Sequence, residues 1–156
     1  MPESFKSRLT RIAFNFFPCY RRTGVRVTYA ASDMHEVRIE LPLNWKTRGY
    51  NGTLFGGSIY ACVDPVYMTM LSVLLGRQYV VWDKAATIDF KRAGRSTLFS
   101  TFKLPEGEID AIRAELEQAE RVERVYDVAL VDGAGVLHAA FRKTIVIRKR
   151  KPKAVA

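Results

Sequence analysis

Much of the chain alternates between apolar and polar residues with a period of two, which is typical of strands that bury one face. The clearest case is residues 35–41, where Val37, Ile39 and Leu41 alternate with charged residues. The same pattern, punctuated by turn residues, predicts six strands at residues 25–31, 35–41, 78–91, 96–104, 121–131 and 136–148. The last two flank Asp132-Gly133-Ala134-Gly135, which favours a hairpin.

Three other segments have the apolar spacing of helices. Residues 57–75 are apolar on nearly every side and end before Gly76, which is suited to cap the helix. Residues 4–17 form a shorter helix with one apolar side, made of Phe5, Leu9, Ile12 and Phe16. The acidic segment 105–120 repeats apolar residues at helical spacing, at Ile109, Ile112 and Leu116.

This order of elements predicts an α+β fold. The long helix is too apolar to be solvated, so we expect an antiparallel sheet wrapped around it. Residues 24–148 would form this domain, residues 1–23 a helical N-terminal extension and residues 149–156 a basic tail. A chain of 156 residues with 48% hydrophobic residues suits one such domain.

The run Asn51-Gly52-Thr53-Leu54-Phe55-Gly56-Gly57, with Asp64 further along the same predicted helix, is the strongest chemical signal. Glycines at the start of a helix expose backbone N–H groups at its positive end. Helical phasing puts Asp64 on a buried face, where an ionised carboxylate must be paired or hydrogen-bonded. The alternative is structural, because Asp64-Pro65 is also typical of the start of a second helical segment.

From Gly52 to Asp64 the chain resembles the signature of hotdog-fold thioesterases of the PaaI type. In that signature His-Gly-Gly opens the central helix and an acidic residue follows, a spacing that Gly56, Gly57 and Asp64 match. The resemblance extends over residues 24–148 and looks closest to a bacterial branch known as a domain of unknown function, related to the C-terminal domain of YiiD. Here Phe55 stands where the signature has histidine.

The resemblance implies a hotdog fold and hydrolysis of an acyl thioester such as an acyl-CoA. Asp64 would be the base or nucleophile, and the Gly56-Gly57 amides would stabilise the oxyanion. It also implies a homodimer or a dimer of dimers, joined edge to edge, with each active site at the interface. No cofactor is implied beyond coenzyme A as part of the substrate.

A second polar group lies at Trp82-Asp83-Lys84 in the third predicted strand. If Trp82, Ala86, Ile88 and Phe90 face the helix, alternation buries Lys84, which would then need a partner such as Asp64. The opposite phase, or a local bulge, would direct Asp83 to the site instead. An ordinary surface ion pair at a sheet edge is the third interpretation.

Three more residues are candidates for contact with substrate. Asn51 and Thr53 would hold the glycine loop or touch the ligand, although Asn-Gly is also an ordinary turn. Tyr60, on the central helix, would line a pocket or belong to the core.

The formal net charge of +9 suggests an anionic partner or a role in solubility. Arg92 and Arg95 lie in a predicted turn and would bind the phosphates of coenzyme A. The basic tail and the Phe-rich N-terminal helix leave peripheral membrane contact open, whereas no motif favours nucleic acid.

The remaining expectations concern cell compartment and metals. We find no twenty-residue apolar stretch and no secretory pattern, so we expect a cytoplasmic protein without a membrane span. Cys19 and Cys62 form no Cys-x-x-Cys pair, and two separated histidines, His35 and His138, predict no metal site. Because Phe55 replaces the histidine, a non-catalytic domain that binds acyl groups or coenzyme A is the alternative to a thioesterase.

Overall fold

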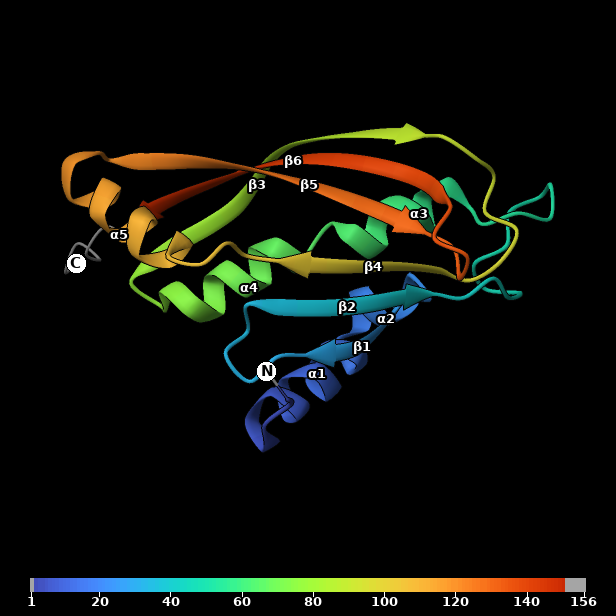
Figure 1. Ribbon diagram of the computed structural model, residues 1–156, viewed down its shortest axis with the longest axis horizontal. Coiled ribbons are helices and arrows are strands. Elements are labelled where there is room, and N and C mark those ends of the chain that lie inside the picture. Colours follow the sequence, from blue (N-terminus) through green and yellow to red (C-terminus); the bar gives the residue numbers. More distant parts are fainter. Residues whose placement is uncertain (1, 151–156) are drawn as a thin grey trace, which may run out of the picture.

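A six-stranded antiparallel sheet forms the frame of the molecule (Figure 1). The computed structural model describes residues 2–150, and the sheet has the strand order β1-β2-β4-β5-β6-β3. The strands are β1 (Arg26–Ala30), β2 (Glu36–Leu41), β3 (Tyr79–Phe90), β4 (Leu98–Lys103), β5 (Arg121–Val131) and β6 (Leu137–Lys149). The helices are α1 (Phe5–Phe16), α2 (Pro18–Arg22), α3 (Gly56–Val63), α4 (Val66–Leu75) and α5 (Glu108–Gln118).

The sheet wraps around α3 and α4, whose apolar side chains form the centre of the core (Figure 1). Strand β4 shows the alternation most clearly, because Leu98, Ser100 and Phe102 are buried and the residues between them are exposed. Burial of apolar area is the main favourable contribution to such a core. The predicted α+β fold, a sheet around a central helix, is confirmed, and so are the three buried apolar positions of α5.

The central helix is broken at Asp64-Pro65. We predicted one helix over residues 57–75, but α3 ends at Val63 and α4 begins at Val66. Proline cannot donate the backbone hydrogen bond that a continuous helix would require. A second helical segment therefore begins after Asp64-Pro65, as the structural interpretation of this pair predicted, although the side chain of Asp64 does not cap α4.

A β-bulge in β3 reverses the phase of its side chains. The register with β6 shifts between Asp83 and Ala85. Asp83 pairs with buried Ile145, whereas Trp82 pairs with Val146. Because paired residues share a face, Asp83 points inward and Trp82 outward. Ala86, Ile88 and Phe90 face inward and Trp82 outward, so the structure has the local bulge that we gave as the alternative to a single phase along this strand.

The N-terminal helices lie at the β1 end of the sheet, and β3 forms the opposite edge (Figure 1). The proposed boundary after residue 23 stays a prediction, as does the role of the basic tail, in which residues 151–156 lie outside the described part of the chain.

One segment, Gly56–Leu75, is long and apolar enough to cross a membrane by length and composition. Our statement that no such stretch exists was therefore wrong by that criterion. In the fold the segment is α3 and α4, packed inside the sheet and interrupted at Asp64-Pro65. Core packing accounts for its apolar composition.

Candidate functional site

The glycine turn is held in place by backbone hydrogen bonds on both sides. Leu54 N donates to Gly94 O over 2.8 Å, and Phe55 N donates to Thr47 O over 2.8 Å. Phe55 is the extended N-cap of α3, so the helix starts at Gly56. The first intrahelical donor to Phe55 O is Ile59 N, which leaves the preceding N–H groups of the first turn without an intrahelical partner. The turn therefore presents backbone donors at the positive end of a helix.

The ring of Phe55 lies over Gly57. A Cβ atom built on Gly57 would come within 2.3 Å of Phe55 Cε1, so the glycine leaves room for this ring. A Cβ on Gly56 would meet the ring of Phe90, whose Cζ and Cε1 would lie at 3.4 and 3.7 Å. Phe55 itself is 59% exposed. The residue that replaces the signature histidine thus places an apolar ring over one glycine, and the backbone N–H groups of the turn remain.

The second half of the candidate site is an ionic cluster around Lys143 of β6. Its side chain is 1% exposed, and Nζ lies 3.2 Å from Asp64 Oδ1 and 3.0 Å from Asp83 Oδ1. Lys143 Nζ also donates to the backbone carbonyl of Asp64, close to the helix break. The contact with Asp83 is an ion pair rather than an aligned hydrogen bond. A buried ammonium thus holds the C-terminal end of α3 to two strands.

Asp64 is less buried than we predicted. Its side chain is 46% exposed, compared with 21% for Asp83. A half-exposed carboxylate with one oxygen on a buried cation can be reached by a small molecule.

Asp83 is the acid of this cluster whose pKa is shifted. Burial raises the pKa of the Asp83 carboxyl and the nearby Asp64 carboxylate adds to that rise, whereas Lys143 opposes it. The bulge that turns Asp83 inward produces this environment.

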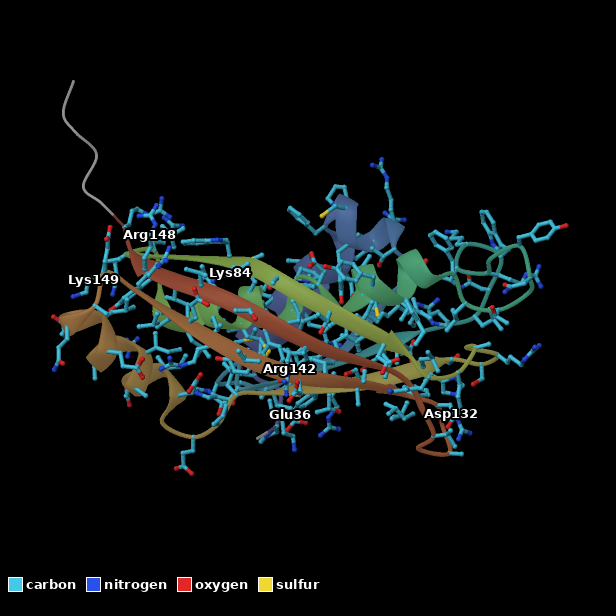
Figure 2. The ribbon with its side chains drawn as sticks, turned by 90° about the horizontal axis from the view of Figure 1, so that it is seen from above. Glu36, Lys84, Asp132, Arg142, Arg148 and Lys149 are labelled. Atoms are coloured by element: carbon cyan, nitrogen blue, oxygen red, sulfur yellow. The ribbon has the colours of Figure 1, made fainter. Side chains whose placement is uncertain are left out.

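Lys84 is not part of the cluster. Its Nζ lies 2.6 Å from Glu123 Oε1, and its side chain is 51% exposed. Figure 2, which views the sheet from above, labels Lys84 and Arg142 among the charged side chains of the outer face. The predicted pair of Lys84 with Asp64 was wrong, because the bulge takes Lys84 out of the inward phase.

Sequence reasoning missed Lys143, although the chain contains a signal for it. Lys143 stands between Phe141 and Ile145 in a two-residue apolar period that alternation assigns to the inner face. A charged residue in such a row needs buried partners.

The other candidates lie around the glycine turn or along α3. Thr53 is buried and its hydroxyl donates to Asn51 Oδ1 over 2.9 Å, so this pair shapes the loop. Tyr60 is 38% exposed, with its ring 6.3 Å from that of Phe141. Arg92 and Arg95 are exposed on the β3–β4 connection, on either side of Gly94, whose carbonyl accepts from Leu54. The basic connection and the glycine turn are therefore neighbours.

Metal ligands do not gather within residues 2–150. No group of three or more His, Cys, Asp or Glu side chains in that range is placed to hold a metal ion. Cys62 is buried and Cys19 exposed, and both thiols are free.

Comparison with known proteins identifies the family and the fold. The family model described as a domain of unknown function, DUF4442, matches residues 6–147. No curated protein matches the chain.

Among solved structures, PA5026 from Pseudomonas aeruginosa, described as a protein of unknown function and probable thioesterase, has a TM-score of 0.81 at 17% identity. The match covers 96% of this chain and 99% of that one. Thioesterase HI1161 from Haemophilus influenzae has a TM-score of 0.71 at 13% identity, with 98% and 97% covered. The PaaI protein from the phenylacetic acid degradation operon of E. coli has a TM-score of 0.63 at 16% identity, with 92% of each chain covered. These structures share the hotdog fold, and the match from α1 to β6 shows that the chain belongs to the DUF4442 family.

Proposed function

We propose that this protein is a thioester hydrolase that acts on an acyl-CoA or a related acyl thioester. The observation that carries the proposal is the Asp64 carboxylate, half-exposed and held by buried Lys143, on the helix that the glycine turn opens. Structural neighbours described as thioesterases support the same class of reaction.

In the proposed reaction Asp64 removes a proton from water or attacks the thioester carbonyl directly. Lys143 engages Oδ1, so that Oδ2 is the oxygen directed to water or substrate. The Gly56 and Gly57 N–H groups stabilise the oxyanion that forms on the carbonyl, since preorganised donors act most strongly on developing charge. When water attacks, the thiolate departs to leave the acid, and the proton held by Asp64 passes to the thiolate to give the free thiol. When Asp64 attacks, the departing thiolate leaves a mixed anhydride on Asp64, which water then hydrolyses to the acid and the free carboxylate.

The two halves of the site do not meet on one carbonyl within one chain. Gly57 and Asp64 are seven residues apart on one face of α3, which is about 10 Å along a helix axis. A homodimer joined along β3 would bring the glycine turn of one copy toward the Asp64 of the other. We therefore propose a homodimer, or a dimer of dimers, with two composite sites.

Coenzyme A is the proposed carrier of the acyl group. Arg92 and Arg95 lie beside the glycine turn and offer guanidinium groups to phosphates. The reaction requires no cofactor beyond the substrate, and we propose a cytoplasmic enzyme because acyl-CoA is used there.

Substitution of Asp64 tests the mechanism. Asp64→Asn is expected to lower kcat/KM for thiol release by about 10³-fold, because the amide is neither base nor nucleophile. Thiol release from a panel of acyl-CoAs, measured with a chromogenic disulfide, gives the comparison. Asp127→Asn, on the outer face beside Arg142, is the matched control and is expected to retain activity. Equal turnover in the Asp64 variant and wild type would refute the role of Asp64.

The oxyanion donors can be removed with little change to the backbone. Gly56→Pro deletes one N–H at the first position of α3, where proline is favoured, whereas Gly56→Ala keeps it and its Cβ fits at 3.4 Å from Phe90. Mixed dimers of Asp64→Asn and Gly56→Pro chains contain one intact composite site, so co-refolding should restore activity. No recovery would contradict the composite arrangement.

A second candidate function is binding of acyl groups without catalysis. The ring of Phe55 over Gly57 favours it, because it partly covers the proposed oxyanion donors. Saturable binding of acyl-CoA with no thiol release from any panel member would support this function over hydrolysis.

A further inference from the structure

The N-terminal helix α1 directs four of its large apolar residues to solvent and not to the core. The side that faces solvent carries Phe5, Leu9, Ile12 and Phe16, which are 80%, 50%, 41% and 65% exposed. Successive residues of a helix are separated by about 100°, so these four form one continuous stripe. We call Phe5, Leu9, Ile12 and Phe16 the outer stripe.

Polar groups attach the opposite side of α1 to the sheet. Asn15 Nδ2 donates to Val27 O over 2.9 Å, and Asn15 Oδ1 accepts from Val27 N over 2.7 Å. Ser7 is buried, and Glu3 just before the helix accepts from Ala30 N over 3.0 Å. These contacts satisfy backbone groups at the outer edge of β1. These hydrogen bonds, together with Phe14, which packs against the core, orient α1 and leave the outer stripe in water.

Basic residues flank the outer stripe. Lys6 and Arg8 are exposed on either side of it by helical phase. Residues 2–26 contain six basic residues and one acid, Glu3, which pairs with Arg11 over 2.8 Å. Arg21 of α2 lines a cleft together with Phe16 and Trp45, and Trp45 is 78% exposed. An apolar stripe between cations, next to an exposed tryptophan, is the composition of helices that lie in membrane interfaces.

The proposed dimer does not cover this surface. The sheet has β3 at one edge and β1 at the other, and α1 packs beside β1 (Figure 1). Pairing along β3 would leave both copies of α1 at the outer ends of the joined sheet. A second copy docked stripe to stripe would bring two basic surfaces together, which like-charge repulsion opposes.

We infer that α1 docks this protein on an anionic lipid surface, with the outer stripe inserted among the acyl chains and Lys6 and Arg8 at the headgroups. The free energy comes from burial of apolar area together with attraction of the cations to anionic lipid. Docking would hold the molecule with its N-terminal end against the membrane.

Flotation of the full chain with lipid vesicles tests the inference. Wild type is expected to float with vesicles of phosphatidylcholine and phosphatidylglycerol, and much less with phosphatidylcholine alone. Phe5→Ser/Phe16→Ser should reduce partitioning more than about tenfold, since two large side chains lose their burial. Lys6→Glu/Arg8→Glu should reduce it by about fivefold or more for each residue changed.

Two control variants separate this surface from general properties of the protein. Val73→Ser/Val125→Ser removes two exposed apolar residues elsewhere, and Arg77→Glu/Arg121→Glu makes the same change in net charge. Both are expected to float as wild type does, and thermal unfolding confirms that every variant is folded.

Three results would overturn the inference. If wild type floated with neither kind of vesicle, α1 would not be a lipid-binding surface. Equal losses in the two charge-reversal variants would indicate adsorption by net charge alone. If Phe5→Ser/Phe16→Ser changed the oligomeric state by light scattering while vesicle binding was unaffected, the outer stripe would be a contact between copies.

Discussion

At the scale of single residues, the ammonium group of Lys143 both stabilises the fold and positions Asp64 of the candidate site. It is buried, and it contacts one carboxylate of the helix break and one of the β3 bulge. Burying a charge is costly unless its partners remain in place. Stability and the position of Asp64 therefore depend on the same three side chains.

Lys143→Met, which keeps the volume and removes the charge, is expected to destabilise the protein by about 2 kcal/mol. The value is lower than for a fully buried pair because Asp64 keeps contact with water. Chemical denaturation of Lys143→Met, Asp83→Asn and the double variant measures the coupling. We expect the double variant to be more stable than the sum of the single losses implies. Strict additivity would contradict the ion pair between Lys143 and Asp83.

Asp83 makes a specific contribution to the pH dependence of stability. Its pKa is raised in the folded protein, so the native state holds its proton more tightly than the unfolded chain. As pH rises from the unfolded value near 3.8 through the raised folded value, the Asp83 contribution to the free energy of unfolding falls. Urea unfolding at a series of pH values should show that the free energy of unfolding of Asp83→Asn rises relative to that of wild type as pH increases over this range. A constant difference between the two proteins would contradict the raised pKa.

At the scale of elements, the connections between helices and strands decide how the site is presented. The turn from α2 to β1 contains Gly24, with φ +85°. A Cβ there would lie 2.2 Å from Thr47 Cγ2. Thr47 is buried, and its hydroxyl donates to Pro42 O over 2.6 Å. Because Thr47 O also accepts from Phe55 N, this contact bears on the glycine turn.

Gly24→Ala is expected to destabilise the protein by at least about 2 kcal/mol, because a left-handed conformation and a steric clash act together. Thermal unfolding measures the loss. Gly133→Ala in the β5–β6 hairpin is the matched control, since no atom lies within 4 Å of its Cβ and its φ is not positive. A similar loss at both positions would show that the Thr47 contact is unimportant.

At the scale of the whole molecule, β3 is a long edge strand with one neighbour, β6. It exposes Trp82 at 37% and Phe90 at 52% of their surfaces. A long edge with unpaired backbone groups is a template for pairing with a second strand. The proposed composite sites require that pairing.

Ala85→Lys/Thr87→Lys places two added cations at this edge and is expected to convert a dimer into a monomer, because like charges would face each other across the symmetric contact. Light scattering should give twice the 17.7 kDa chain mass for wild type and the single mass for the variant. Activity should fall in parallel. A monomeric wild type would remove the basis for composite sites.

Much of this architecture could be predicted from the sequence because it follows from the spacing of apolar residues within each element and from the turn residues between elements. Three elements form where the pattern predicts them. They are the strand in which Val37, Ile39 and Leu41 alternate, the acidic helix with Ile109 and Ile112, and the hairpin at Asp132. Apolar periodicity and turn residues act over a few neighbouring positions, so one chain contains the information. The glycine turn and the following Asp64 were found for the same reason.

Contacts between distant residues were decided by tertiary structure. The bulge beside Asp83 is a property of two paired strands, and it moved Lys84 outward and Asp83 inward. Lys143 is 79 residues from Asp64 in the chain and reaches it only because β6 crosses α3 in the fold. The direction of the outer stripe was set by the hydrogen bonds between Asn15 and Val27, since a helical period shows which residues share a side but not which side meets the sheet.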